Sequence, residues 1–341
     1  MQLKTLPTGR MSTKYRQAAI RVDERQLLIT DLRGSEQEKD LSEPVNCNGL
    51  GRVRHFRRGA SSGWPMNPLP IDPACTVLGL PDTNVLRAQV FQNAVCNWRC
   101  WYCFVDFELL AASRTRSSWI TAEELVDLYL AQPDPPPMID LTGGQPDLTP
   151  EWVPWMMSAL RARGLDRSVY LWSDDNLSND YFWRYLTDSD RRSIEDYPAY
   201  GRVCCFKGIT PEAFTFNTMA EPILFDQQFE LFHRLLGLRL DLYAYVTLTT
   251  PNGSNIERDV ATFLDRLQQI DAQLPLRTIP LKIQIFSPVA GRMNDARHHS
   301  LVHQQTAIEA WVRELEHRFT PTEIGSRITD IPYRRQNASL P

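Results

Sequence analysis

Short runs of apolar residues alternate along this chain with longer segments of helical periodicity. Six runs of four to seven residues follow one another from residue 85 onward. They are Val85–Val90, Met138–Leu141, Val169–Trp172, Val203–Phe206, Leu242–Leu248 and Leu281–Phe286. Continuous apolar runs of this length are typical of parallel strands that are buried on both faces. The pattern therefore predicts six parallel strands.

Helix-start and helix-stop residues separate these runs. Thr121 opens a capping-box sequence, Thr149 precedes a proline at a first helical position, and Gly164 follows as a stop. Apolar residues at helical spacing predict two longer helices, over Asp226–Leu236 and Asn255–Leu274. Strands alternating with helices predict an α/β fold, a partial (β/α)6 TIM-like barrel with its chemistry at the C-terminal ends of the strands.

The first eighty residues have a different character. The apolar-alternating stretch Ala18–Ile29 predicts a short strand or hairpin, and residues 44–80, rich in Gly, Pro and Arg, predict long ordered loops. We expect residues 1–84 to form a loop-rich N-terminal extension that packs on the barrel. Residues 85–295 are expected to form the core, and residues 296–341 a C-terminal helix and tail.

Composition and charge narrow the class of protein. With 43% hydrophobic and 23% charged residues among 341, the chain has the composition of an ordinary folded protein, which excludes disorder and coiled coil. The formal net charge of −4 argues against a surface built to bind nucleic acid. The sequence has no apolar run long enough to span a membrane and no apolar segment of a secretory signal at its start. These features predict a cytoplasmic location.

The most informative segment is a C-x3-C-x2-C run, formed by Cys96, Cys100 and Cys103 directly after the first predicted strand. Thiolates are the ligands of iron–sulfur clusters, and three of them in one loop can hold three of the four irons of a cubane. The fourth iron is then open to another ligand. Zinc and a chance grouping are the alternatives, although zinc normally takes four ligands and no further Cys or His follows within about twenty residues.

The cysteine run, with an aromatic residue before its third cysteine, resembles the radical S-adenosylmethionine (SAM) superfamily. The resemblance implies a [4Fe–4S] cluster on Cys96, Cys100 and Cys103, whose open iron binds the amino and carboxylate groups of SAM. It implies that one-electron reduction cleaves SAM to methionine and a 5′-deoxyadenosyl radical, which abstracts hydrogen from a substrate. Tyr102 falls at the family's adenine-side aromatic position. A flavodoxin- or ferredoxin-like electron donor is the implied partner.

A second motif agrees with this resemblance. Thr142, Gly143, Gly144, Gln145 and Pro146 follow the second predicted strand and resemble the GGEP motif of the family, which contacts the methionine amino group of SAM. Two glycines allow the backbone to approach a ligand without a Cβ in the way. Gln145 stands where the family has Glu, which keeps the carbonyl acceptor and loses the charge.

The next two strand ends resemble glycyl-radical-enzyme activases. On that alignment Asp174 accepts from the amino group of SAM and Lys207 pairs with its carboxylate. A helix-capping role for Asp174 and a solvated or ion-paired Lys207 are the alternatives. The ribose-binding Asp of the activases falls on Cys205 and their His on Pro288, which counts against an activase function.

Other candidate residues carry weaker signals. Arg52 and Arg54 belong to a basic patch that, together with Trp64, is a candidate for the substrate side; a solvated or packed loop is the alternative. Four further cysteines are Cys47, Cys75, Cys204 and Cys205. Because Cys204 and Cys205 are adjacent on a strand and point to opposite faces, we expect ordinary thiols rather than a second cluster.

These observations predict an enzyme that generates a radical from SAM and acts on an unidentified substrate, which can be a protein, a peptide or a small molecule. One alternative is an activase that installs a glycyl radical on a partner protein. An alternative of another class is a non-catalytic iron–sulfur or zinc-binding protein.

Overall fold

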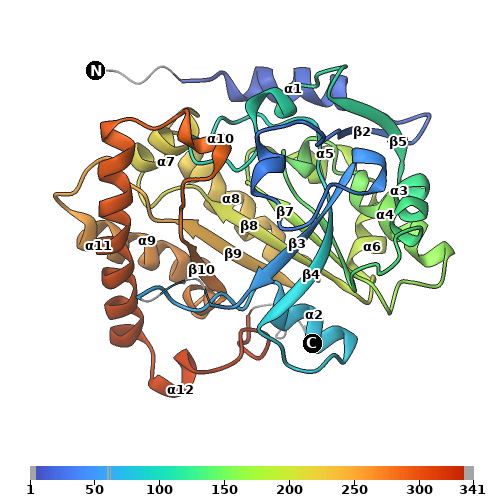
Figure 1. Ribbon diagram of the computed structural model, residues 1–341. Helices are drawn as coiled ribbons and strands as arrows, with labels where there is room; N and C mark the ends of the chain where they lie inside the picture. Colours follow the sequence, from blue (N-terminus) through green and yellow to red (C-terminus); the bar gives the residue numbers. More distant parts are fainter. Residues whose placement is uncertain (1–4, 60, 62, 334–341) are drawn as a thin grey trace.

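A curled, seven-stranded sheet forms the centre of the computed structural model, which describes residues 5–59, 61 and 63–333 (Figure 1). The strands follow the order β10-β9-β8-β7-β6-β4-β3. Their bounds are β3 Gly51–Arg57, β4 Val85–Phe91, β6 Met138–Leu141, β7 Tyr170–Asp175, β8 Tyr200–Phe206, β9 Leu242–Thr247 and β10 Thr278–Leu281. Neighbours from β4 to β10 are parallel, whereas β3 runs antiparallel to β4.

Five of the six predicted strands are confirmed in place. The predicted run Met138–Leu141 coincides with β6, and four others overlap β4, β7, β8 and β9. Strand β7 continues three residues beyond the predicted end at Trp172, so Asp174 and Asp175 lie within the strand rather than after it.

The sixth strand was predicted at the wrong place. The sheet ends with β10, which precedes most of the predicted run Leu281–Phe286 and contains Pro280. A proline is compatible with this strand because β10 is an edge strand, where one row of backbone donors has no partner strand. Beyond β10, the Ile283 backbone donates to and accepts from the side chain of Gln304 at 3.0 and 2.9 Å, so the chain leaves the sheet there.

One face of the sheet curls inward to form a half-barrel. Strands β7 and β9 are not neighbours, yet the rings of Trp172 and Tyr243 lie 5.7 Å apart on this inner face. Near the start of the strands a Cβ on Gly201 would lie 2.2 Å from the hydroxyl of Tyr170, so aromatic rings fill this part of the barrel. The fold is mixed α/β with a partial TIM-like barrel, as the sequence predicted.

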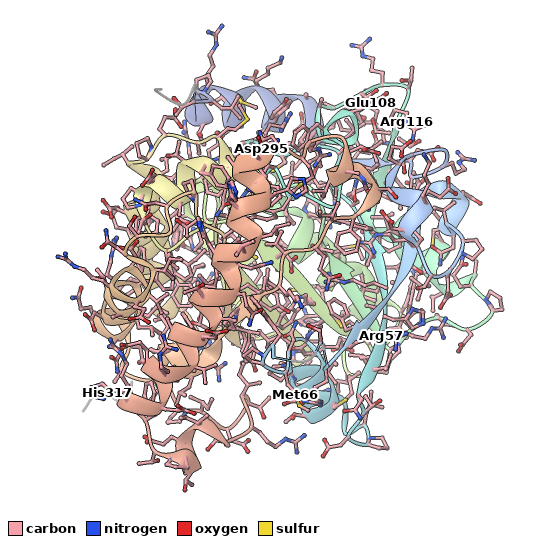
Figure 2. All side chains as sticks on the ribbon, turned by 60° about the vertical axis from the view of Figure 1, so that its left-hand side comes forward. Arg57, Met66, Glu108, Arg116, Asp295 and His317 are labelled. Carbon is pink, nitrogen blue, oxygen red and sulfur yellow. The ribbon has the colours of Figure 1, made fainter. Side chains whose placement is uncertain are left out.

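Helices surround the sheet (Figure 1), and α11 runs along the molecule from Asp295 to near His317 (Figure 2). The helices are α1 Thr8–Ala19, α2 Ile71–Leu78, α3 Ala122–Leu130, α4 Trp152–Ala162, α5 Tyr181–Tyr185, α6 Asp188–Glu195, α7 Pro211–Thr218, α8 Leu224–Leu236, α9 Ile256–Ile270, α10 Ser287–Ala290, α11 Asp295–Arg318 and α12 Pro321–Ile324. No helix in the described part of the chain is long and apolar enough to cross a membrane.

Most of the helix-end predictions are confirmed. Helix α3 begins with a complete capping box, in which Thr121 and Glu124 exchange backbone and side-chain hydrogen bonds of 2.8 and 3.2 Å. Helices α8 and α9 match the two longer predictions. The cap at Thr149 is wrong, because α4 begins at Trp152 and the Thr149 hydroxyl accepts from Asn93 instead, at 3.0 Å.

The N-terminal part of the chain is more regular than expected. The predicted hairpin exists as β1 (Ile20–Arg21) and β2 (Gln26–Thr30), which joins β5 (Ser117–Thr121) in a second sheet. The prediction of loops over residues 44–80 is wrong where β3 and α2 form. Because β3 pairs with β4 along its whole length, this part of the chain belongs to the central sheet. The division into three segments at residues 84 and 295 stays a prediction.

Candidate functional site

The three clustered cysteines lie on the loop that leaves the carboxyl end of β4. Cys96 is buried, and Cys100 and Cys103 are half-buried; all three are free thiols. The Cys103 backbone donates to the Cys100 carbonyl at 2.9 Å, which closes a tight turn between the last two cysteines. The carboxyl end of a barrel strand is where loops of this fold carry chemistry.

The residues between Cys96 and Cys100 are all hydrogen-bonded to α1. The donor and acceptor pairs are Asn97 Nδ2 to Ser12 Oγ at 2.9 Å, Trp98 Nε1 to Thr8 Oγ1 at 3.3 Å, and Arg99 Nη2 to Tyr15 OH at 2.8 Å. This support has no signal in the sequence pattern, because α1 is a polar segment that lies almost ninety residues upstream. Helix α1 therefore fixes the first half of the cysteine loop.

The residues between Cys100 and Cys103 are also held. Trp101 donates from its indole nitrogen to Asn217 Oδ1 at 3.0 Å and from its backbone to the Asn217 carbonyl at 3.1 Å. Tyr102 shares a 3.0 Å hydrogen bond with Thr247 at the end of β9, and burial raises its pKa above the ordinary value. The loop is thus positioned before any ligand binds.

Burial and a nearby cation act in opposite directions on the cysteine thiols. Burial raises the pKa of Cys100 to about 12, and the nearby ammonium of Lys207 acts in the opposite direction. The amide nitrogen of Asn176 lies 3.9 Å from the sulfur of Cys96, within hydrogen-bonding range for sulfur. Hydrogen bonds to cysteine sulfur are one means by which proteins tune iron–sulfur clusters.

The three thiols are not gathered as they would be around one ion. In the described residues, no three or more His, Cys, Asp or Glu side chains are arranged to hold a single metal ion. A single zinc ion would need each sulfur at about 2.3 Å from one point. A cubane makes no such demand, because each thiolate binds a different iron. Three free thiols are the kind of donor that iron–sulfur clusters take.

The two glycines of the second motif pack against the chain that leads to the cysteines. Both have positive φ, +84° at Gly143 and +70° at Gly144. A Cβ on Gly144 would lie 2.4 Å from the Asn93 carbonyl oxygen and 2.5 Å from that of Val95. The sequence explained these glycines by the approach of a ligand. The structure adds a requirement of its own, since only glycine allows the two loops to meet this closely.

Gln145 and Pro146 are buried next to these glycines. The Gln145 side chain donates to Asp175 Oδ1 at 2.7 Å and accepts from the Asn176 backbone at 3.1 Å. Both polar atoms of the amide are thus bonded within the protein. Pro146 opens the short 3-10 helix η4 (Pro146–Leu148). A direct contact of either residue with SAM stays a prediction.

Asp174 and Lys207 lie on the inner side of the half-barrel, near the cysteine loop. Thr142 donates its hydroxyl to Asp174, and burial raises the pKa of that carboxyl. The backbone carbonyl of Lys207 accepts from Asn217 at 2.9 Å. Among the described residues, the ammonium group of Lys207 makes no hydrogen bond. A helix-capping role for Asp174 is ruled out by its position inside β7.

Arg52 and Arg54 point into the half-barrel from β3, where they face a carboxylate that the sequence did not single out. In the sheet, Arg52 is opposite Val90 and Val90 is opposite Asp140, so the three share the inner face. Arg54 Nη1 lies 3.7 Å from Asp140 Oδ2. The guanidinium of Arg52 lies 5.2 Å from the ring centre of Phe104, which directly follows Cys103.

Trp64 has a different place from these arginines. It is buried, and its indole nitrogen donates to the carbonyl of Pro280 in β10 at 3.1 Å. Nearby, Tyr245 donates to the Leu69 carbonyl and accepts from Asn67, at 3.2 and 3.3 Å. Trp64 thus anchors the segment that follows β3 across the inner side of the barrel. A direct contact with substrate stays a prediction for this residue.

The four remaining cysteines lie apart from the loop or on the sheet itself. Cys47 is buried and donates to the Leu128 carbonyl, and Cys75 is buried in α2. Cys204 and Cys205 are consecutive on β8 and therefore face opposite sides of the sheet. Cys205 is on the inner face, since it pairs with Tyr245.

A buried network of charged side chains lies behind the sheet, and the sequence pattern does not indicate it. Arg202 on β8 contacts both Asp147 and Asp175, and all three side chains are at most 4% exposed. Burial raises the pKa of Asp147 to about 7, although Arg202 acts against this rise. Because Asp175 also accepts from Gln145, the network connects the glycine motif to β7 and β8.

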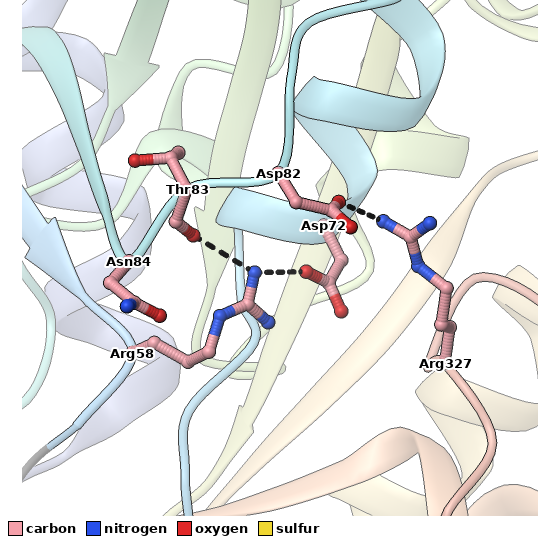
Figure 3. A pocket seen from close by; sticks show the side chains of 6 residues that line it. All are labelled: Arg58, Asp72, Asp82, Thr83, Asn84 and Arg327. Atoms are coloured by element: carbon pink, nitrogen blue, oxygen red, sulfur yellow. Dashed lines mark hydrogen bonds and ion pairs between the residues drawn. The ribbon is translucent and has the colours of Figure 1, made fainter.

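One surface pocket lies away from the cysteines, next to the start of β4 (Figure 3). Its volume is about 400 Å³. The two arginines that line it are already paired, Arg58 with Asp72 and Arg327 with Asp82, each at 2.6 Å. A pocket whose charges are satisfied within the protein offers no unpaired group for chemistry.

Comparison with known proteins adds little to this geometry. Similar solved structures include SuiB from Streptococcus suis bound to the precursor peptide SuiA and SuiB bound to S-adenosylmethionine. Both have a TM-score of 0.37 and 12% identity, over 53% of this chain and 36% or 37% of the SuiB chain. No protein-family model and no curated protein matches the chain. A likeness this low does not decide what the chain does.

Proposed function

We propose that this protein is a radical SAM enzyme in which Cys96, Cys100 and Cys103 hold a [4Fe–4S] cluster. The observation that carries the proposal is the cysteine loop: three free thiols at the carboxyl end of a barrel strand, with every intervening residue hydrogen-bonded to a neighbouring element. Three ligands leave one iron of a cubane without a protein donor. When reduced, such a cluster supplies the electron that cleaves SAM.

The protein's own contribution is to bind and orient SAM beside the cluster. Gly143 and Gly144 present their backbone next to the cysteine loop, and Tyr102 closes that loop against β9. Asp174 and Lys207 supply one carboxylate and one ammonium group on the inner face, which match the amino and carboxylate groups of the methionine end of SAM. The Gln145 side chain supports this region through its bonds to Asp175 and the Asn176 backbone, and Pro146 is buried next to it.

The reaction requires two partners. An external one-electron donor of the flavodoxin or ferredoxin kind would reduce the cluster. The second partner is the substrate, which would supply the hydrogen atom that this chemistry removes. Strands β3 and β10 are the two edges of the sheet, and the segment around Trp64 is bonded to β10.

The test compares the wild type with Cys100→Ala after anaerobic reconstitution with iron and sulfide. The wild type should bind iron, absorb broadly near 400 nm and form 5′-deoxyadenosine from SAM under dithionite. Cys100→Ala should lose all three properties, while the matched control Cys75→Ala should keep them, since Cys75 lies in α2. A colourless wild type containing one zinc, or SAM cleavage by Cys100→Ala, would show that the proposal is wrong.

A further inference from the structure

Buried polar atoms without partners mark one place inside the half-barrel. Asp140 is fully buried, and neither of its carboxylate oxygens has a hydrogen-bond partner among the described residues. Arg52 is 6% exposed, and its Nε atom likewise has no partner in the described part of the chain. Burying such groups without partners costs folding free energy, so they are rarely kept unless a ligand satisfies them.

These groups lie on the same inner face, on strands separated only by β4. Arg52 and Arg54 alternate along β3 with Val53 between them, so both arginines point to the inner face where Asp140 lies. Burial and the neighbouring Asp174 raise the pKa of Asp140, and burial together with Arg54 lowers the pKa of Arg52 to about 9. The site therefore holds two guanidinium groups and one carboxyl that protein contacts alone leave incompletely bonded.

Of these three side chains, that of Arg54 is the most exposed. The side chain of Arg54 is 41% exposed, while that of Asp140, 3.7 Å away, is 0% exposed. A ligand that contacts Arg54 here would lie beside Asp140. The ring centre of Phe104, which directly follows Cys103, lies 5.2 Å from the Arg52 guanidinium, so the ligand would lie next to the cysteine loop.

The chemistry of the groups defines the ligand. Two arginines on one face suit a carboxylate, which guanidinium groups bind through paired hydrogen bonds. Asp140 needs a hydrogen-bond donor beside the carboxylate of the ligand. An N–H group on the carbon atom that carries this carboxylate meets that need. We propose that Arg52, Arg54 and Asp140 bind an amino-acid unit of the substrate, its carboxylate on the arginines and its N–H on Asp140. That the unit belongs to the substrate rests on the function proposed above.

The test uses N-acetylglycine as the probe and the full chain after anaerobic reconstitution, with binding measured by calorimetry. We expect saturable binding in the millimolar range, the strength that a ligand of this size reaches. N-acetylglycinamide, which lacks the carboxylate, and acetate, which lacks the N–H, should each bind at least tenfold more weakly. Inorganic phosphate that binds as well as N-acetylglycine, or no saturable binding of N-acetylglycine, would overturn the proposal.

Two variants separate a binding role from a structural one. Arg52→Met should weaken N-acetylglycine at least tenfold, and Arg52→Lys should weaken it less. The double variant Arg52→Met with Asp140→Leu should melt at a higher temperature than the wild type, because it replaces buried polar groups that lack partners by apolar ones. A lower melting temperature together with unchanged probe binding by Arg52→Met would show that the arginine is structural.

SAM itself carries an amino-acid end, so its affinity is measured on the same samples. Arg52→Met should bind SAM as the wild type does, because the proposed SAM contacts are at Asp174 and Lys207. A loss of SAM affinity in Arg52→Met would move the site to SAM and overturn the proposal. Probe binding requires neither SAM cleavage nor an intact cluster, so its outcome is independent of the cysteine test.

Discussion

Asn217 connects the cysteine loop to two strand ends, and its replacement by alanine gives the sharpest test of how that loop is held. Its fully buried side chain makes four hydrogen bonds: from Trp101 Nε1 and Thr249 Oγ1, and to the carbonyls of Lys207 and Thr249, all between 2.8 and 3.0 Å. At about 1 kcal/mol for each buried bond, Asn217→Ala should lose roughly 4 kcal/mol of unfolding free energy. For 341 residues this corresponds to roughly 6 °C in melting temperature.

The assay is thermal unfolding of the metal-free protein, followed by iron analysis after reconstitution. Asn252→Ala is the matched control, because the Asn252 side chain accepts an exposed hydrogen bond from the Ser254 backbone at 2.9 Å. This control should change the melting temperature by less than about 1 °C. Asn217→Ala should also hold less iron than the control, since Trp101 lies between two of the cysteines. Equal melting temperatures for the two variants would refute the idea that Asn217 supports the loop.

Three further predictions follow from buried charges. Arg202→Met should destabilise the fold by roughly 3–5 kcal/mol in chemical denaturation, because Asp147 and Asp175 would stay buried without a cation; a loss below about 1 kcal/mol would contradict this. Lys207→Ala should weaken SAM binding at least tenfold in calorimetry with no change in iron content, and an unaltered SAM affinity would return Lys207 to a structural role. Because the pKa of buried Asp140 is raised, the native state holds the proton of this carboxyl more tightly than the unfolded chain does. The contribution of Asp140 to the unfolding free energy therefore falls as pH rises above about 4. Asp140→Asn should therefore reduce the fall in unfolding free energy between low and neutral pH, and parallel pH curves for variant and wild type would show that the carboxyl does not titrate in this way.

The parallel strands could be predicted because apolar runs are a local signal. The predicted bounds of β6 match the structure at both ends. The prediction for β7 ends too early because the last residues of that strand, Asp174 and Asp175, are charged. The last strand was misplaced because Pro280 argues against a strand unless the strand is known to lie at the sheet edge. That knowledge comes from the strand order, which the pattern of the chain does not contain.

The N-terminal elements could not be predicted, because their partners are distant in sequence. Helix α1 is mostly polar, and its role appears only in its bonds to the cysteine loop. Strand β3 looks like a basic loop because its inward positions carry Arg52 and Arg54 rather than apolar residues. Alternation of apolar and polar residues predicts a strand only when the buried face of that strand is apolar. The buried face of β3 carries charged residues instead.

The cysteine motif was predictable for the opposite reason, since its chemistry is contained in eight consecutive residues. The glycine motif was found as well, but the packing that requires Gly144 depends on Asn93 and Val95, about fifty residues earlier in the chain. For Gln145 the sequence suggested an acceptor for SAM, whereas its amide is bonded to Asp175 and the Asn176 backbone. A motif can thus be located from the sequence while the contacts of its side chains cannot.

Asp140 shows what signal could have been used. It is the only polar residue in the predicted strand run Met138–Leu141, where a buried parallel strand should be apolar on both faces. Asp140 lies on β6, and its sheet partner on β7 is Trp172. Asp174 is two residues beyond Trp172, so its side chain points to the same face of the sheet. Both carboxylates therefore lie on the inner face near the strand ends. A carboxylate that interrupts an apolar strand costs folding free energy, and this cost is tolerated at sites where a ligand binds. Such an interruption, rather than the basic patch alone, marks the inner face of this barrel as the place where its substrate would be recognised.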